Sequence, residues 1–203
     1  MRKKMRKCLF YMLAGLMLLA TPFTVSAEGT ANYCFGSGGP YRKAPVSYEV
    51  EKVYHAADLD GVENLNELES MFVTEDSIYV ATLNAVVVLD HDFQVKHILS
   101  EYTDENGNAA KINAPQGLFV TEEGTLYICE PNSSHVLIFD KNYELLHNYG
   151  APEGLDITVV YKPTQIVVDS LDRMYIIASS IYEGILEVNA DNKFQRYFGS
   201  TTV

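Results

Sequence analysis

The sequence predicts an all-β chain built on a four-stranded unit that occurs three times. Short runs of apolar and β-branched residues alternate with polar turns, which is typical of strands. No stretch sustains helical periodicity. Three segments also align on tyrosines spaced 48 residues apart, Tyr79, Tyr127 and Tyr175, which indicates an internal repeat.

The first 27 residues are typical of a secretory signal peptide. Five basic residues lie within the first seven positions, an apolar run covers residues 8–20, and the small residues Val25, Ser26 and Ala27 close the segment. The apolar run is shorter than the roughly 20 residues that span a bilayer. We therefore expect cleavage after Ala27 and a secreted or cell-surface protein, with an uncleaved anchor as the alternative.

The charge balance narrows the classes of partner. Residues 28–203 keep 10 of the 15 basic residues and all 27 acidic ones, a formal net charge of −17. Nucleic acid and anionic membranes both require a positive surface, so we expect neither as a partner. We expect no membrane span in the mature chain, while an anchor in sequence beyond residue 203 is left open.

Residues 28–45 form the expected flexible leader, and they contain one of the two cysteines of the mature chain. A disulfide between Cys34 and Cys129 suits an oxidising compartment. The alternative, which we favour, is an unpaired Cys34 and an apolar, buried Cys129 within the strand-like run 126–129.

The repeated units follow from residue 46 onward. Each contains two runs around a polar turn (71–80, 118–128 and 166–176), a third run that ends in Asp or Asn (86–90, 135–140 and 184–189) and a polar, alternating fourth run (93–98, 143–149 and 194–199). The predicted units are about 66–100, 113–150 and 163–200. An additional copy of the fourth strand is expected at 46–55.

Four-stranded units at this spacing are the sequence form of β-propeller blades, ordered from inner to outer strand. The predicted propeller portion is residues 46–203, with three complete blades and an orphan outer strand. That strand would pair with the last blade of a closed ring. Because propellers typically close with ~4–8 blades, either the chain is a truncated product or two half-rings close as a dimer. Truncation is the simpler interpretation.

The second unit contains Asn113-Ala114-Pro115-Gln116-Gly117-Leu118-Phe119-Val120, followed by Tyr127-Ile128-Cys129-Glu130. This stretch resembles an NHL repeat. The first unit keeps Asn66 and the third keeps Pro163 of the pattern. The resemblance implies an NHL-type, six-bladed-like propeller. The leader segment 33–41 also resembles those of exported NHL-repeat proteins of Gram-positive bacteria, some of which continue into membrane-anchoring segments.

Binding in propellers usually uses the face that carries the outer-to-inner connections and the second-to-third-strand turns. Here that face contains long connections at residues 100–113 and 150–162. The candidate binding residues on it are Tyr102, Asp104, Glu130, Asn132, Tyr182 and Glu183. We expect a binding or protein-interaction module whose partner is a protein, a peptide or a carbohydrate.

Enzymatic alternatives depend on metal ligands that the sequence does not assemble. Residues 104–108 offer oxygen ligands as calcium loops do, but Pro115 stands where such a loop needs Glu, so a surface turn is preferred. A gluconolactonase-like hydrolase or lyase would need a divalent metal. The histidines lack metal-ligand spacing, namely His55, His91, His97, His135 and His147. We therefore assign no cofactor, metal ligand or catalytic residue, and a structural ectodomain of a surface complex is the remaining alternative.

Overall fold

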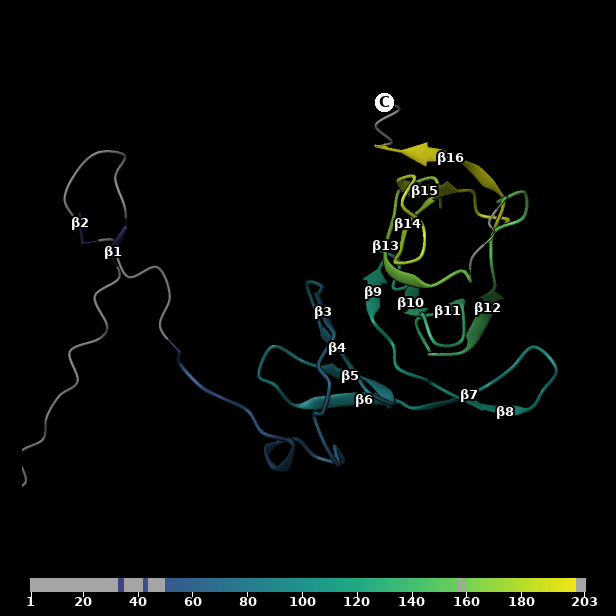
Figure 1. The fold of residues 1–203 in the computed structure, drawn as a ribbon. Coiled ribbons are helices and arrows are strands. Elements are labelled where there is room, and N and C mark those ends of the chain that lie inside the picture. Colours follow the sequence, from purple (N-terminus) through teal and green to yellow (C-terminus); the bar gives the residue numbers. More distant parts are fainter. Residues whose placement is uncertain (1–32, 35–41, 44–49, 157, 159, 200–203) are drawn as a thin grey trace, which may run out of the picture. The chain divides into compact units, whose positions relative to one another are not determined.

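The computed structural model describes residues 33–34, 42–43, 50–156, 158 and 160–199 (Figure 1). The chain divides into two units, Met1–Val53 and Tyr54–Val203. In the first unit, strands β1 (Tyr33–Cys34) and β2 (Arg42–Lys43) form an antiparallel pair. The predicted signal peptide and most of the predicted leader lie outside the described residues and stay predictions.

The second unit contains three four-stranded antiparallel sheets, in which each strand pairs with its neighbour in sequence. Blade 1 consists of β3 (Ser70–Val73), β4 (Ile78–Thr82), β5 (Ala85–Leu89) and β6 (Val95–Leu99). Blade 2 consists of β9 (Gly117–Val120), β10 (Leu126–Glu130), β11 (His135–Phe139) and β12 (Leu145–Tyr149). Blade 3 consists of β13 (Pro163–Val168), β14 (Met174–Ala178), β15 (Ile185–Val188) and β16 (Phe194–Phe198).

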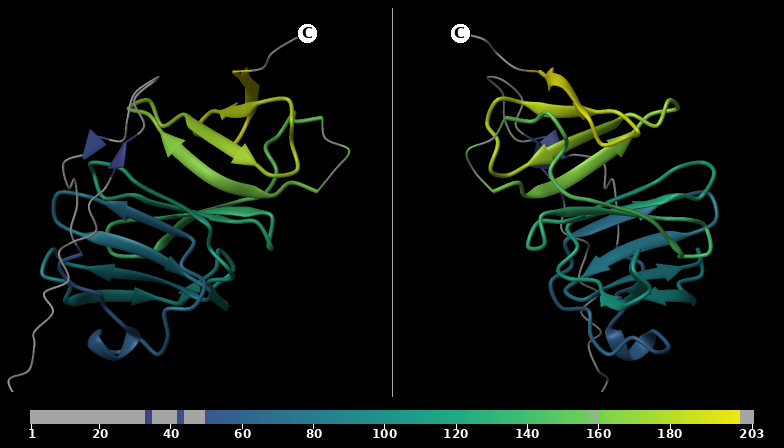
Figure 2. Two further views of the ribbon diagram at one scale, coloured as in Figure 1. Left: turned by 60° about the vertical axis from the view of Figure 1, so that its left-hand side comes forward. Right: turned by 90° about the vertical axis from the view of Figure 1, so that its right-hand side faces the viewer.

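These sheets are β-propeller blades, since each is a four-stranded antiparallel meander and consecutive blades pack against each other (Figure 2). The predicted all-β class is confirmed, and the three sheets lie within the predicted units. The helical structure of the described residues is the single 3-10 turn η1 (Ala56–Asp58). No helix in those ranges is long and apolar enough to cross a bilayer.

The orphan outer strand expected at 46–55 is not found in the described part of that segment. Residues 50–55 carry no strand, and η1 follows directly. The third strands β5, β11 and β15 are already paired with β6, β12 and β16. No third-strand edge is therefore left for this segment within the described blades.

A short hairpin lies in the connection 100–113, which the sequence analysis treated as a loop. Strand β7 (Glu101–Thr103) pairs with β8 (Ala109–Lys111). Lys111 Nζ lies 2.8 Å from Glu101 Oε1 across this pair, on the exposed surface. Because the two strands lack an alternating apolar face, their sequence carries no strand signal.

The same side-chain turn joins the third and fourth strands of every blade. The Oδ1 atom of Asp90, Asp140 or Asn189 accepts hydrogen bonds from the backbone N–H groups two and four residues later. The residue between those two donors has a positive φ, at Phe93, Tyr143 and Asn192. The predicted role of the terminal Asp or Asn is confirmed, since its carboxylate or amide replaces a backbone acceptor in the turn.

The core lies between the blades. One cluster joins blade 1 to blade 2 and includes Tyr79, Val88 and Phe139. A second cluster joins blade 2 to blade 3 and includes Tyr127 and Cys129. Cys129 carries a free thiol that is fully buried, as its apolar context predicted. Burial raises the pKa of this thiol.

Gly117 lies at a close approach between the inner strands β9 and β13. A Cβ atom at this position would lie 2.6 Å from the carbonyl oxygen of Thr164 and 2.8 Å from the Cα of Gln165. Both neighbours are backbone atoms, so they cannot rotate away. The glycine of the NHL-like stretch is therefore required by blade-to-blade contact.

We expect Gly117→Ala to lower the free energy of unfolding by about 2 kcal/mol or more, because overpacking at a rigid contact has costs of this order. Chemical denaturation monitored by circular dichroism measures the change. Gly150→Ala is the matched control, since its Cβ would lie 3.6 Å from the His135 ring, an ordinary contact. Equal stability of the two variants would contradict the steric role of Gly117.

Candidate functional site

Four of the six predicted binding residues, Glu130, Asn132, Tyr182 and Glu183, lie at one end of blades 2 and 3, and Tyr102 and Asp104 belong to the connection that starts from that end of blade 1. Because antiparallel strands alternate in direction, the second-to-third-strand turns and the connections between blades share this end. We call it the loop face, formed by the turns 83–84, 131–134 and 179–184 and the connections 100–116 and 150–162. The candidate residues are Tyr102, Asp104, Glu130, Asn132, Tyr182 and Glu183.

Glu130 ties two parts of the loop face together. It ends β10 and is only 2% exposed. Its Oε1 accepts a hydrogen bond of 2.8 Å from the Asn113 backbone N–H, and its carboxylate also accepts one from Ser133. Asn113 Nδ2 donates in turn to Ser133 Oγ at 3.2 Å. The connection that enters blade 2 is thereby held against the β10–β11 turn.

Burial raises the pKa of Glu130, while the hydrogen bonds from Asn113 and Ser133 oppose the shift. Burial is the largest of these effects, so the carboxyl group binds a proton more readily than it would in water. Sequence reasoning placed Glu130 on a loop surface as a ligand contact. In the structure it positions the loops, and its carboxylate is occupied by them.

Tyr102 and Asp104 lie beside this network. The Tyr102 ring packs edge-on against Phe139 with 5.4 Å between centroids. Burial raises the pKa of Tyr102, and the negative charges of Glu130 and Asp104 raise it further. The structure thus brings these three candidates together.

The Asp104 carboxylate is used by its own turn. Its Oδ1 accepts hydrogen bonds from the backbone N–H groups of Asn106 and Asn108, and its Oδ2 accepts one from Asn108 Nδ2. The backbone hydrogen bond from Asn108 is the main cause of the lowered pKa of Asp104. Among the described residues, no three His, Cys, Asp or Glu side chains gather as a metal site would need.

Tyr182 and Glu183 lie one blade further along the loop face. Tyr182 is 93% exposed, and its backbone N–H donates to Glu183 Oε2 at 3.0 Å. Burial raises the pKa of nearby Tyr197, and the negative charges of Glu183 and Asp156 add to that effect. Asn132 is exposed in the β10–β11 turn. This part of the face offers an aromatic ring in an acidic setting.

The structure adds residues that the sequence analysis missed. A cavity of about 580 Å³ opens beside blade 1 and is lined by polar groups that include Glu63, Thr82, Asn84 and Lys111. Thr82 ends β4 and Asn84 lies in the β4–β5 turn, which is equivalent to the turn that supplied Asn132. Applying the same turn rule to blade 1 would have found them.

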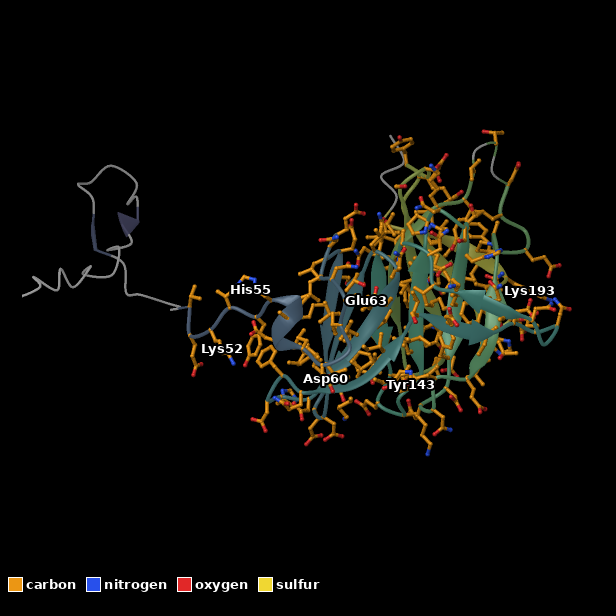
Figure 3. All side chains as sticks on the ribbon, turned by 90° about the horizontal axis from the view of Figure 1, so that it is seen from below. Lys52, His55, Asp60, Glu63, Tyr143 and Lys193 are labelled. Atoms are coloured by element: carbon orange, nitrogen blue, oxygen red, sulfur yellow. The ribbon has the colours of Figure 1, made fainter. Side chains whose placement is uncertain are left out.

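A second cavity, of about 820 Å³, lies at the opposite end of blades 1 and 2. Its lining includes Thr74, Lys96, Thr121 and Tyr143. Lys96 Nζ donates to Ser77 Oγ at 2.8 Å within it. Glu63 and Tyr143, one residue from each cavity, are labelled in Figure 3.

No family model and no curated protein matches the chain. Solved structures with a similar backbone include the extracellular domain of BT4673 from B. thetaiotaomicron. It is 18% identical, the match covers 64% of the present chain and 18% of the BT4673 chain, and the TM-score is 0.48. The RRP9 WD40 repeats match at 12% identity over 65% and 38%, with a TM-score of 0.48. Virginiamycin B lyase from Staphylococcus aureus matches at 9% identity over 66% and 56%, with a TM-score of 0.39.

The chain thus spans less than two thirds of each of these proteins, and all three TM-scores lie below 0.5. The β-propeller class therefore rests on the strand topology within the chain itself. The loop face of that propeller portion is the candidate functional site.

We expect Glu130→Gln to remove part of the pH dependence of folding stability. Since the folded-state pKa of Glu130 is raised, the folded chain holds its proton more tightly, and this residue's contribution to stability falls as the pH rises from the unfolded pKa through the folded one. Gln keeps an acceptor for the Asn113 N–H. Unfolding free energies of both proteins at a series of pH values measure the difference.

The difference should favour the Gln variant increasingly toward neutral pH. Glu130→Ala serves as the contrast, because it leaves the Asn113 N–H without its acceptor and should destabilise by roughly 1–3 kcal/mol at every pH. Parallel pH profiles for the wild-type chain and Glu130→Gln would contradict a raised pKa.

Proposed function

We propose that the chain is an exported binding module on an NHL-type, six-bladed-like β-propeller, and that it takes its partner on the loop face. The observation that carries this proposal is Tyr182, which is 93% exposed beside Glu183 on the same face as the Glu130 network. A large aromatic ring left in solvent supplies contact area at low cost in side-chain entropy. The hydrogen bonds of Glu130 keep the neighbouring loops ordered.

The charge of the face supports a partner with positive or hydroxyl-rich chemistry. Glu105, Asp156 and Glu183 are exposed acidic residues of its connections and turns, and Asp104 is a half-buried one. Residues 28–203 carry a formal net charge of −17. Such a field attracts a basic protein or peptide, while exposed tyrosine and carboxylate groups also suit a carbohydrate.

The NHL assignment is supported by the roles of two residues of the resembling stretch. Asn113 donates its backbone N–H to Glu130 and its side-chain amide to Ser133. Gly117 allows the close approach of β9 and β13. Each of these positions therefore has a physical function in joining one blade to the next.

Export is supported by the sequence of residues 1–27. We expect the mature protein to begin at Glu28 when the gene is expressed in a secreting bacterium. Mass spectrometry of the N-terminal peptide from the culture medium or the cell surface checks this. Ala27→Lys should block cleavage, because signal peptidase requires a small residue there. Retention of Met1 in the exported wild-type chain would contradict the prediction.

Binding is tested with two probes, a lysine-rich peptide and a neutral oligosaccharide, by isothermal titration calorimetry. Tyr182→Ala should weaken binding of the recognised probe about tenfold or more, as loss of an interface tyrosine commonly does. Glu183→Gln should weaken the peptide more than the oligosaccharide, with a loss that shrinks at high salt.

Leu171→Ala is the matched control, since Leu171 is 68% exposed on the β13–β14 turn, at the opposite end of the same blade. It should bind as the wild-type chain does. Equal losses in Leu171→Ala and Tyr182→Ala, or no binding of either probe, would contradict the loop-face site. Repeating the titration with EDTA and with added calcium tests the metal-dependent alternative.

A further inference from the structure

Each described blade has two apolar faces, and the two faces at the ends of this set of three have no neighbouring blade among the described residues. We call the side of a blade that faces the next one in sequence its forward face, and the other side its rear face. Strand register defines both, because directly paired residues point to the same side of a sheet. The clusters between blades 1 and 2 and between blades 2 and 3 each join a forward face to a rear face.

The forward face repeats position by position. In blade 1 it comprises Phe72, Tyr79, Ala81, Val86, Val88, His97 and Leu99. In blade 2 it comprises Phe119, Tyr127, Cys129, Val136, Ile138, His147 and Tyr149. In blade 3 the equivalent residues are Val167, Tyr175, Ile177, Ile185, Glu187, Arg196 and Phe198.

Blade 3 therefore presents the pattern of an interior face without a neighbour. Val167, Ile177 and Phe198 are 55%, 47% and 54% exposed. The residues equivalent to Ile177 are Ala81 in blade 1 and Cys129 in blade 2, and both are fully buried in the interfaces between blades. The apolar surface that would be buried against a further blade is thus left in solvent.

Two positions of this forward face are charged, and they neutralise each other. Glu187 stands where blades 1 and 2 have Val88 and Ile138, and it is 5% exposed. Its Oε2 accepts a hydrogen bond of 2.7 Å from Arg196 Nε, and Arg173 Nη1 lies 3.7 Å from its Oε1. Since the carboxylate already has its partners, the face can be covered without a charge from the other side.

The rear face of blade 1 is the counterpart. Met71 and Val73 are 65% and 52% exposed, whereas the equivalent residues of blades 2 and 3 are buried in the interior interfaces. Those equivalents are Leu118 and Val120 in blade 2 and Ile166 and Val168 in blade 3. An interior rear face is fully covered, while this one is open along its inner strand.

Residues 54–65 cover the outer part of this rear face but do not replace a blade. Leu59 packs on Ile78, Val87 and Leu89 there. The interior interfaces contain equivalent contributions from their own connections, namely Ile112 and Tyr102 in one and Tyr161 and Leu155 in the other. Each of those interfaces accommodates both its connection and a forward face. Leu59 therefore leaves the place of the neighbouring forward face available.

We propose that the forward face of blade 3 docks on the rear face of blade 1 of a second copy of this chain, twice, so that two copies close a ring of six blades. The interface continues one that the chain already forms twice internally, forward face on rear face. Six blades lie within the usual range for propellers, ~4–8. Two such head-to-tail contacts close on a two-fold axis and give every described blade a neighbour on both of its faces.

The purified chain is measured by sedimentation velocity and light scattering over a wide range of concentration. The expected result is a two-chain particle whose mass does not grow further with concentration. Ile177→Asp on the forward face and Met71→Asp on the rear face should each weaken dimerisation at least about 100-fold, since each buries an unpaired carboxylate. Leu146→Asp is the matched control, because Leu146 is 47% exposed on β12 in the middle blade.

Mixing the two interface variants supplies the sharper test. The Ile177→Asp chain keeps an intact rear face and the Met71→Asp chain keeps an intact forward face. The mixture should therefore form a one-to-one heterodimer through its one unaltered contact, more weakly than the wild-type dimer, at a concentration at which neither variant pairs alone. This rescue also shows that both variants are folded. The milder changes Phe198→Ser and Val73→Ser repeat the test if circular dichroism shows either Asp variant to be unfolded.

Four outcomes would overturn the proposal. They are a wild-type chain that stays monomeric at every concentration, a mass that increases without limit, dissociation by Leu146→Asp as well, and failure of the mixed variants to pair. Because none of these readouts involves a loop-face ligand, the proposal stands or falls independently of the binding function.

Discussion

Each blade has two apolar faces, and the rest of the structure depends on how these faces pack between neighbouring blades. Side chains alternate along every strand, so one set contacts the preceding blade and the other contacts the next. At Gly117 the inner strands β9 and β13 approach so closely that a Cβ atom would lie 2.6 Å from a carbonyl oxygen. Blade 2 packs against a neighbour on each face, so the packing fixes the positions of its strand ends and of the turns that follow them.

The loop face is ordered as a consequence of that packing. Cys129 is fully buried between blades 2 and 3, and Glu130 is the next residue of β10. The packed strand therefore delivers the Glu130 carboxylate to a fixed place, where the Asn113 N–H and Ser133 reach it. The Tyr182 side chain is exposed and is not held by this packing, so it is available to contact a partner.

The strands were predictable because their signals are local. Tyrosines 48 residues apart and the Asp or Asn at the end of each third strand indicated the repeat before any packing was known. The hairpin β7–β8 was missed, since its alanines and charged residues carry no alternation and its order depends on Tyr102 packing on Phe139. The burial of Glu130 was missed for a related reason, because a carboxylate in sequence shows neither its exposure nor its donors. The roles of the candidate ligand residues stay predictions.

Glu187 shows how an end face can differ from an interior one without losing its geometry. Its two interior equivalents are Val88 and Ile138, and the change to a carboxylate is accompanied by Arg196 in place of His97 and His147. The pair is satisfied within the sheet, and removal of either partner would leave the other charge uncompensated. A partner that fits this face must therefore match its apolar inner part while leaving the ion pair intact. The rear face of blade 1, with Met71 and Val73 exposed along its inner strand, offers an apolar surface of this kind.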